Sequence, residues 1–101
     1  MANPKEPKPT QINVELPATL EATYANMALI SHTTSEIIVD FASALPNKPS
    51  ARINSRIVMT PMNAKLLLRA LGENLSKFEE KFGEIRIPDN VILDPNRGFV
   101  K

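Results

Sequence analysis

Two apolar runs on either side of a short polar turn constrain the fold of this chain most strongly. The first run ends at Ile30, the second begins after Glu36, and the residues between them are Ser31-His32-Thr33-Thr34-Ser35. Small hydroxylated residues favour turns because their side chains hydrogen-bond to nearby backbone groups. Runs rich in β-branched residues predict strands, and so short a connection predicts that the two strands pair antiparallel.

The segment before the turn contains one clear strand pattern and one ambiguous element. Apolar and polar residues alternate over residues 11–16, which predicts a half-buried strand that ends at Pro17. Residues 20–31 are interpreted as a second strand, although good helix formers leave a helix open over Leu20–Leu29. Met27–Ile30 is apolar at every position, which is typical of a strand in a sheet covered on both sides.

The residues after the turn predict two more antiparallel strands, over 36–44 and 51–59. Pairing of these strands would place two acidic and two basic side chains on one outer face. They are Glu36 and Asp40 on the first strand and Arg52 and Arg56 on the second. Facing opposite charges contribute roughly 0.2–1 kcal/mol per pair, so they help to set the register.

A long helix follows these strands. Thr60 is a favoured N-cap residue, Pro61 is favoured at the first helical position, and Gly83 is a typical stop. The apolar residues between them recur at alternating spacings of four and three, in a heptad pattern: Ala64, Leu68, Leu71, Leu75, Phe78 and Phe82. The sequence therefore predicts an α+β fold, in which an antiparallel meander of three to four strands is followed by one long C-terminal helix packed on the sheet.

A chain of 101 residues holds one domain at most. Met1–Thr10 is rich in Pro and Lys and predicts a disordered tail, residues 11–87 predict the single α+β domain, and residues 88–101 predict an irregular C-terminal tail. No run approaches the roughly 20 apolar residues that a membrane span needs, so we expect no membrane association. The absence of Cys fits a cytoplasmic protein.

The residue types predict no catalytic, cofactor-binding or metal site. His32 is the sole His and the sole candidate general base. Its neighbour Ser31 would point to the opposite side of an extended chain, so the two need not converge as a catalytic pair requires. The chain has no Cys, no carboxylate cluster of calcium-binding spacing and only three Gly for a phosphate loop. We therefore expect a protein that is not an enzyme and uses no cofactor.

Apolar residues on more than one side of the predicted sheet and helix indicate self-association, because a chain of this size has a limited core. We expect a homo-oligomer, a dimer or larger. The predicted interface residues are Met27, Leu29, Ile30, Leu66, Leu67, Ala70 and Gly72. The leading hypothesis is a binding or assembly module that also engages another protein, in the manner of a chaperone.

A nucleic-acid-binding protein is the alternative hypothesis. The candidate contacts are Arg52, Arg56, Lys65 and Arg69, which would form a basic strand and helix face. The formal net charge of +1 gives no strong long-range attraction to a phosphate backbone. Nucleic acid is therefore the less favoured partner.

Four motifs in order carry a family resemblance: Ile12-Asn-Val-Glu-Leu-Pro, Tyr24-Ala-Asn-Met-Ala-Leu-Ile-Ser-His, Glu36-Ile-Ile-Val-Asp-Phe and Arg56-Ile-Val-Met-Thr-Pro. Over residues 12–85 the chain resembles small bacterial and archaeal proteins of the DUF3467 type, a domain of unknown function. The resemblance implies a shared fold and carries over no activity. The order of elements is also similar to that of SecB-type export chaperones, which pack helices and sheets between subunits and hold unfolded clients on apolar grooves.

Overall fold

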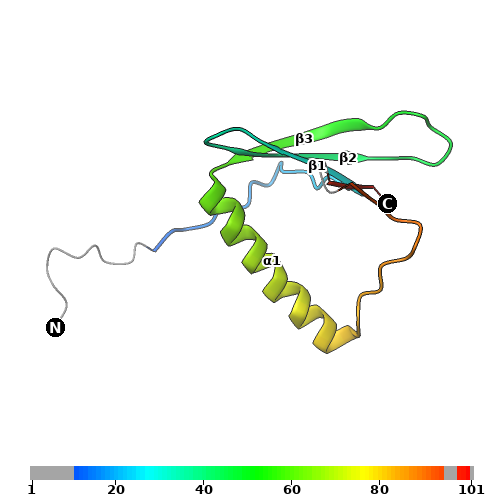
Figure 1. The fold of residues 1–101 in the computed structure, drawn as a ribbon. Coiled ribbons are helices and arrows are strands. Elements are labelled where there is room, and N and C mark those ends of the chain that lie inside the picture. The colour runs from blue at the N-terminus through cyan, green and yellow to red at the C-terminus, as the bar shows by residue number, and fades with distance from the viewer. Residues whose placement is uncertain (1–10, 95–97, 101) are drawn as a thin grey trace, which may run out of the picture.

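A computed structural model describes residues 11–94 and 98–100 of the chain. The described elements are β1 (Met27–His32), β2 (Ile37–Ser43), β3 (Arg52–Met59), α1 (Pro61–Phe82), β4 (Ile92–Asp94) and β5 (Gly98–Val100). The predicted α+β class is confirmed, because an antiparallel meander is followed by one long helix (Figure 1). The predicted tail over residues 1–10 lies outside the described residues.

The described strands form one five-stranded sheet in the order β3-β2-β1-β5-β4. The predicted meander is β1-β2-β3, and every neighbouring pair in the sheet is antiparallel. The sheet exceeds the expected three to four strands because β4 and β5 come from residues 88–101, where we expected no regular structure. That segment returns from the far end of α1 and places β5 beside β1.

The predicted strand over residues 11–16 does not form in the described chain. Alternating residues become a strand only where a neighbouring strand supplies backbone hydrogen bonds, and residues 11–16 have no such neighbour among the described elements. Val14 accordingly remains 92% exposed. The ambiguous segment Leu20–Leu29 is not a helix either, since regular structure begins only with β1 at Met27.

Side-chain hydrogen bonds fix both ends of the β1–β2 hairpin. At the turn, Thr33 Oγ1 accepts from the backbone N–H of Ser35 (3.2 Å) and of Glu36 (3.1 Å), which confirms the predicted turn. At the open end, Asn26 Nδ2 donates to the carbonyl of Ala44 (3.0 Å), and Asn26 Oδ1 accepts from the Ala44 N–H (2.7 Å). The Asn26 side chain thus extends the ladder by one step beyond the paired strands.

A β-bulge changes which side chains of β3 share a face. Phe41 pairs with Ser55 but Ala42 pairs with Ile53, so Asn54 is an extra residue on β3. Arg56 faces Asp40 as predicted, whereas Arg52 pairs with Ser43 on the opposite face. The expectation that Arg52 and Arg56 lie on one face is therefore wrong, because the extra residue shifts the alternation by one position.

The helix α1 has the bounds that its local signals predict. Thr60 Oγ1 accepts from the N–H of Asn63 (3.1 Å), and at the other end the N–H of Gly83, with φ of 99°, donates to the carbonyl of Glu79 (2.9 Å). The structure describes every residue of α1, and none of them is buried. Figure 1 shows the helix leaving the end of β3 at an angle, so within one chain it buries no side chain against the sheet. The single residue between β3 and α1 leaves little freedom for the helix to fold back.

The core of the described chain is small. Of residues 11–91, 93 and 98–100, only Ala28, Ala42 and Asp40 are buried. Two alanines and one carboxylate bury little apolar surface, and burial of apolar surface is the main favourable term in folding. The single chain therefore keeps most of its apolar side chains in contact with solvent.

Candidate functional site

One face of the sheet forms a continuous apolar surface, called here the Phe41 face. Facing residues of paired strands lie on the same side of a sheet, so the register defines the members of this face. They are Ala28 and Ile30 of β1, Ile37, Val39 and Phe41 of β2, and Ile57 and Met59 of β3. Ile30, Val39 and Ile57 form a row straight across three strands. Ile30 and Ile57 are exposed, so the centre of this face is open to solvent.

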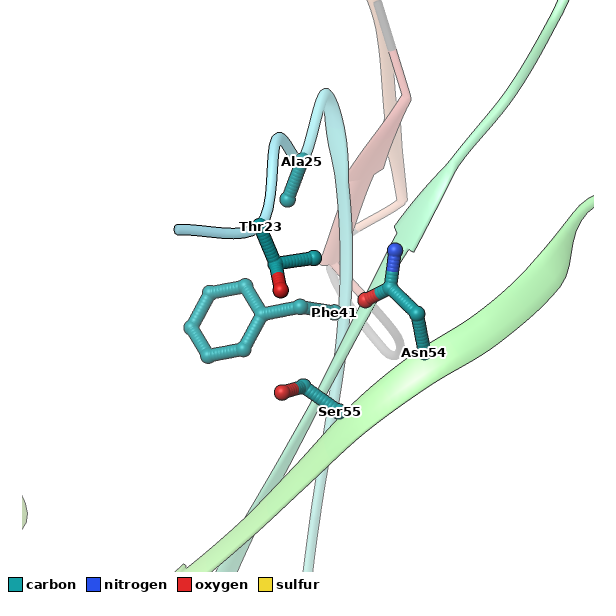
Figure 2. Close-up of a pocket in the computed structure, with 5 residues that line it drawn as sticks. All are labelled: Thr23, Ala25, Phe41, Asn54 and Ser55. Carbon is teal, nitrogen blue, oxygen red and sulfur yellow. The ribbon is translucent and has the colours of Figure 1, made fainter. Parts of the chain in front are cut away.

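The bulge opens a shallow pocket at one end of the Phe41 face. The pocket has a volume of about 330 Å³. Five residues line it: Thr23, Ala25, Phe41, Asn54 and Ser55. Figure 2 shows the hydroxyls of Thr23 and Ser55 on either side of the Phe41 side chain, with the Asn54 carboxamide close by. An apolar floor with a few hydrogen-bonding groups at its rim is the usual character of a binding pocket. None of these five lining residues is ionisable, so the pocket offers no general acid or base.

The opposite face of the sheet, called here the Asp40 face, is apolar around one ion pair. Its apolar members are Met27, Leu29, Ile38, Ala42, Ile53 and Val58. Arg56 Nε and Nη2 donate to Asp40 Oδ1 (2.7 Å) and Oδ2 (3.0 Å) in a bidentate pair. The hydrogen bond from Arg56 lowers the pKa of Asp40, and the same bond raises the pKa of Arg56. Asp40 is only 7% exposed, so a fixed charge pair crosses this face between β2 and β3.

The third apolar surface is the heptad seam of α1. Its exposed members range from Leu75 at 43% to Leu68 at 70% exposed. Phe78 and Phe82 stack at a tilt near the C-terminal end, with ring centroids 4.9 Å apart. The Lys81 ammonium lies 5.4 Å from the Phe82 ring centroid. The seam therefore carries large aromatic side chains at its C-terminal end and a small side chain, Ala64, at its N-terminal end.

The seven residues predicted as an oligomer interface do not form one patch. Met27 and Leu29 belong to the Asp40 face, and Ile30 belongs to the Phe41 face. Leu66, Leu67, Ala70 and Gly72 all lie on α1 and are exposed. The residues predicted to form one oligomer interface are thus divided among the Asp40 face, the Phe41 face and α1.

The four residues predicted to contact nucleic acid are divided as well. Arg52 and Arg56 lie on opposite faces of β3, and Arg56 is engaged by Asp40. Lys65 and Arg69 are one turn apart on α1. The structure therefore does not bring the two strand arginines together on a single basic surface.

The candidate catalytic pair does not converge. Ser31 pairs with Ile38 and His32 with Ile37, so the two side chains lie on opposite faces of β1. Among the described residues, no group of three or more His, Cys, Asp or Glu side chains is placed to hold a metal ion. Within the same described part of the chain, no helix has the length and apolar character to cross a membrane.

Sequence reasoning missed the pocket at Phe41, because its shape depends on the bulge. The only signal was Asn54 itself, since Asn is a poor strand former in the middle of a predicted strand. Bulges are frequent beside functional sites, where they redirect a side chain.

Comparison with known proteins gives a family and no closer relative. A family model described as "Protein of unknown function (DUF3467)" matches residues 1–87. No curated protein and no solved structure matches the chain.

Proposed function

The chain belongs to the family described as protein of unknown function (DUF3467), and that family assigns it no activity, so we propose a function from the geometry of the chain itself. The proposed function is that of a non-enzymatic, self-associating module that binds another protein. The observation that carries this proposal is the apolar row of Ile30, Val39 and Ile57 on the Phe41 face, in which Ile30 and Ile57 are exposed and Val39 is half-buried. Large contiguous exposed apolar patches on a folded chain mark sites of interaction with another protein, a membrane or a ligand.

The chemistry of the Phe41 face favours an extended apolar polypeptide as the bound partner. The row runs across three strands without a charged side chain, and the pocket at Phe41 and Ser55 lies beside it, in the next row of the same face. An apolar side chain of the partner fits against Phe41, while the rim hydroxyls and the Asn54 carboxamide can hydrogen-bond to the partner's backbone. Unfolded clients of a chaperone offer this combination of apolar side chains and free backbone groups.

The Phe41 face is preferred to the Asp40 face for this role. The Asp40–Arg56 pair places two fixed charges in the middle of the Asp40 face. A bound apolar segment would have to desolvate that pair, which costs free energy unless the geometry compensates fully. The row of Ile30, Val39 and Ile57 on the Phe41 face contains no ion pair, so binding there requires no such desolvation.

Two neighbouring residues of β3 provide a matched test. Ile57 is 46% exposed on the Phe41 face, and Val58 is 48% exposed on the Asp40 face. β3 is an edge strand, where an added Lys is well tolerated. The assay is the fluorescence anisotropy of a labelled, reduced and carboxymethylated polypeptide that has no fold of its own.

Ile57→Lys should weaken this binding at least about tenfold, because a buried Ile contributes about 1.5–3 kcal/mol and a Lys would be left in its place. Val58→Lys should bind like the wild type. Equal loss in both variants, or no loss in either, would remove the Phe41 face as the client site.

The nucleic-acid alternative predicts a different response. Binding through phosphate contacts falls steeply as salt rises, whereas apolar binding does not. Titration of labelled DNA and RNA at two salt concentrations, with Arg52→Ala as the variant, separates the two functions.

A further inference from the structure

The charges beside the heptad seam of α1 are unevenly distributed along the helix. The N-terminal half carries Lys65 and Arg69 and no acidic residue, whereas the C-terminal half carries all three acidic side chains of the helix together with Lys77 and Lys81. The seam itself is also uneven, since it begins at Ala64 and ends at Phe82. Both gradients favour a partner helix that runs in the opposite direction.

We propose that α1 pairs antiparallel with α1 of a second copy of this chain, about a twofold axis that passes close to Gly72 and Asn74. The partner is thereby specified as the chain itself, through one helix face and in one register. This inference rests on the self-association in the proposed function, but it does not depend on client binding at the Phe41 face.

One register places the smallest seam residue opposite a large one and leaves no pair of alanines or of Phe82 rings facing each other. Ala64 meets the partner's Phe82, Leu68 meets the partner's Phe78, and Leu71 meets the partner's Leu75. The helix has 22 residues, so these layers fill its length of about 33 Å. A parallel pair would instead stack Phe82 on the partner's Phe82 at one end and leave two alanines facing each other at the other. Such a pair would splay at one end and leave a void at the other.

The same register brings opposite charges together beside the seam. Antiparallel pairing places Lys65 next to the partner's Glu79, and symmetry repeats the contact at the other end. Glu79 is already held in position, because its Oε2 accepts from the Ile85 N–H (2.9 Å). Its other carboxylate oxygen remains available for Lys65 of the partner subunit.

Gly72 supplies a second, independent observation. A glycine inside a helix costs about 1 kcal/mol relative to alanine. A Cβ added at Gly72 would meet no atom within 4 Å in its own chain, so packing within the chain does not require glycine there. In the proposed register Gly72 faces the partner's Gly72, on the same flank as the Lys65–Glu79 contacts. The missing side chains allow the two helices to approach closely at the axis.

A mixing experiment tests the charge contacts. Lys65→Glu alone puts like charges opposite each other twice, and so does Glu79→Lys alone, so each variant should self-associate about tenfold more weakly than the wild type. An equimolar mixture of the two variants restores both opposite-charge contacts, and it should form a heterodimer about as tightly as the wild type. Sedimentation equilibrium measures all three affinities. A mixture that associates no better than either variant would overturn the register.

The absence of Cys from the chain permits a direct test of direction. Asn74→Cys lies beside the proposed axis and should crosslink to its own copy with a short bismaleimide. Lys65→Cys should not crosslink to itself, because the two thiols would lie about 21 Å apart along the helices, but it should crosslink to Glu79→Cys. Self-crosslinking of Lys65→Cys would overturn the antiparallel arrangement while leaving self-association intact. A protein that stays monomeric in sedimentation would instead overturn the self-association itself, and client binding to the Phe41 face would then be judged separately.

Discussion

Replacement of Gly98 by alanine should release β5 and β4 from the sheet. Gly98 has a φ of 142°, a conformation that only glycine adopts readily. A Cβ at this position would overlap the backbone carbonyl of Ala28 in the neighbouring strand. β1 cannot yield, because it pairs with β2 along its whole length on the other side. The strain is therefore relieved only if β5 moves away.

The size of this effect follows from what β5 contributes to the sheet. Met27, Ala28 and Leu29 of β1 pair with β5, which corresponds to about two ladder hydrogen bonds at roughly 1 kcal/mol each. Phe99 is 42% exposed, and its buried part adds about 1 kcal/mol. Together these contacts hold β5 in place by about 3 kcal/mol, equivalent to about a hundredfold in the opening equilibrium.

Hydrogen exchange followed by mass spectrometry measures this opening. In Gly98→Ala, amides of residues 27–29 and 98–100 should exchange up to about a hundredfold faster, while those of β2 keep their protection. Ser50→Ala is the control, because Ser50 is exposed in the loop between β2 and β3 and this change should leave all of these exchange rates unaltered. Unchanged exchange at β5 in Gly98→Ala would refute the close approach of Gly98 to β1.

Two further predictions concern α1 and the Asp40 face. Thr60→Ala removes the hydroxyl that accepts from the Asn63 N–H and should lower the free energy of unfolding by about 1 kcal/mol, measured by urea denaturation. Thr60→Ser keeps a hydroxyl and should retain most of that stability, and equal losses in the two variants would show that the hydroxyl is not the cap. Asp40 has a pKa lowered by its bond to Arg56, so its stabilising contribution is complete above the ordinary value of 3.8 and is lost as the pH falls through the lowered value. Thermal unfolding between about pH 5 and pH 2 should therefore depend less on pH in Asp40→Asn than in the wild type, and parallel curves would contradict the role of this pair.

Local signals in the sequence predicted both ends of α1 correctly, whereas the sequence did not predict the long-range pairing of β5 with β1. The cap at Thr60, the proline at position 61 and the stop at Gly83 each act through backbone groups within a few residues, so they can be recognised without the rest of the fold. The pairing of β5 with β1 joins residues far apart in the chain and depends on the close approach at Gly98. No local pattern reports that approach.

The candidate site shows the same division. The charge pair of Asp40 and Arg56 was predicted from simple alternation and is confirmed. The same alternation failed for Arg52, three pairs further along, because the bulge at Asn54 moves Arg52 to the other face. The bulge also opens the pocket at Phe41. The strand predicted over residues 11–16 failed for a related reason, since alternation describes what a strand would bury and not whether a neighbour exists.

If a second copy of the chain covers its apolar surfaces, the folded protein must be at least a dimer, so the deciding measurement is its mass in solution. Light scattering over a dilution series, with circular dichroism at each concentration, gives the mass of the folded species. We expect a mass at least twice that of the 11.2 kDa chain wherever the protein is folded, with the helix and sheet signals lost as the assembly dissociates. A folded monomer of 11.2 kDa that persists at every concentration would contradict it.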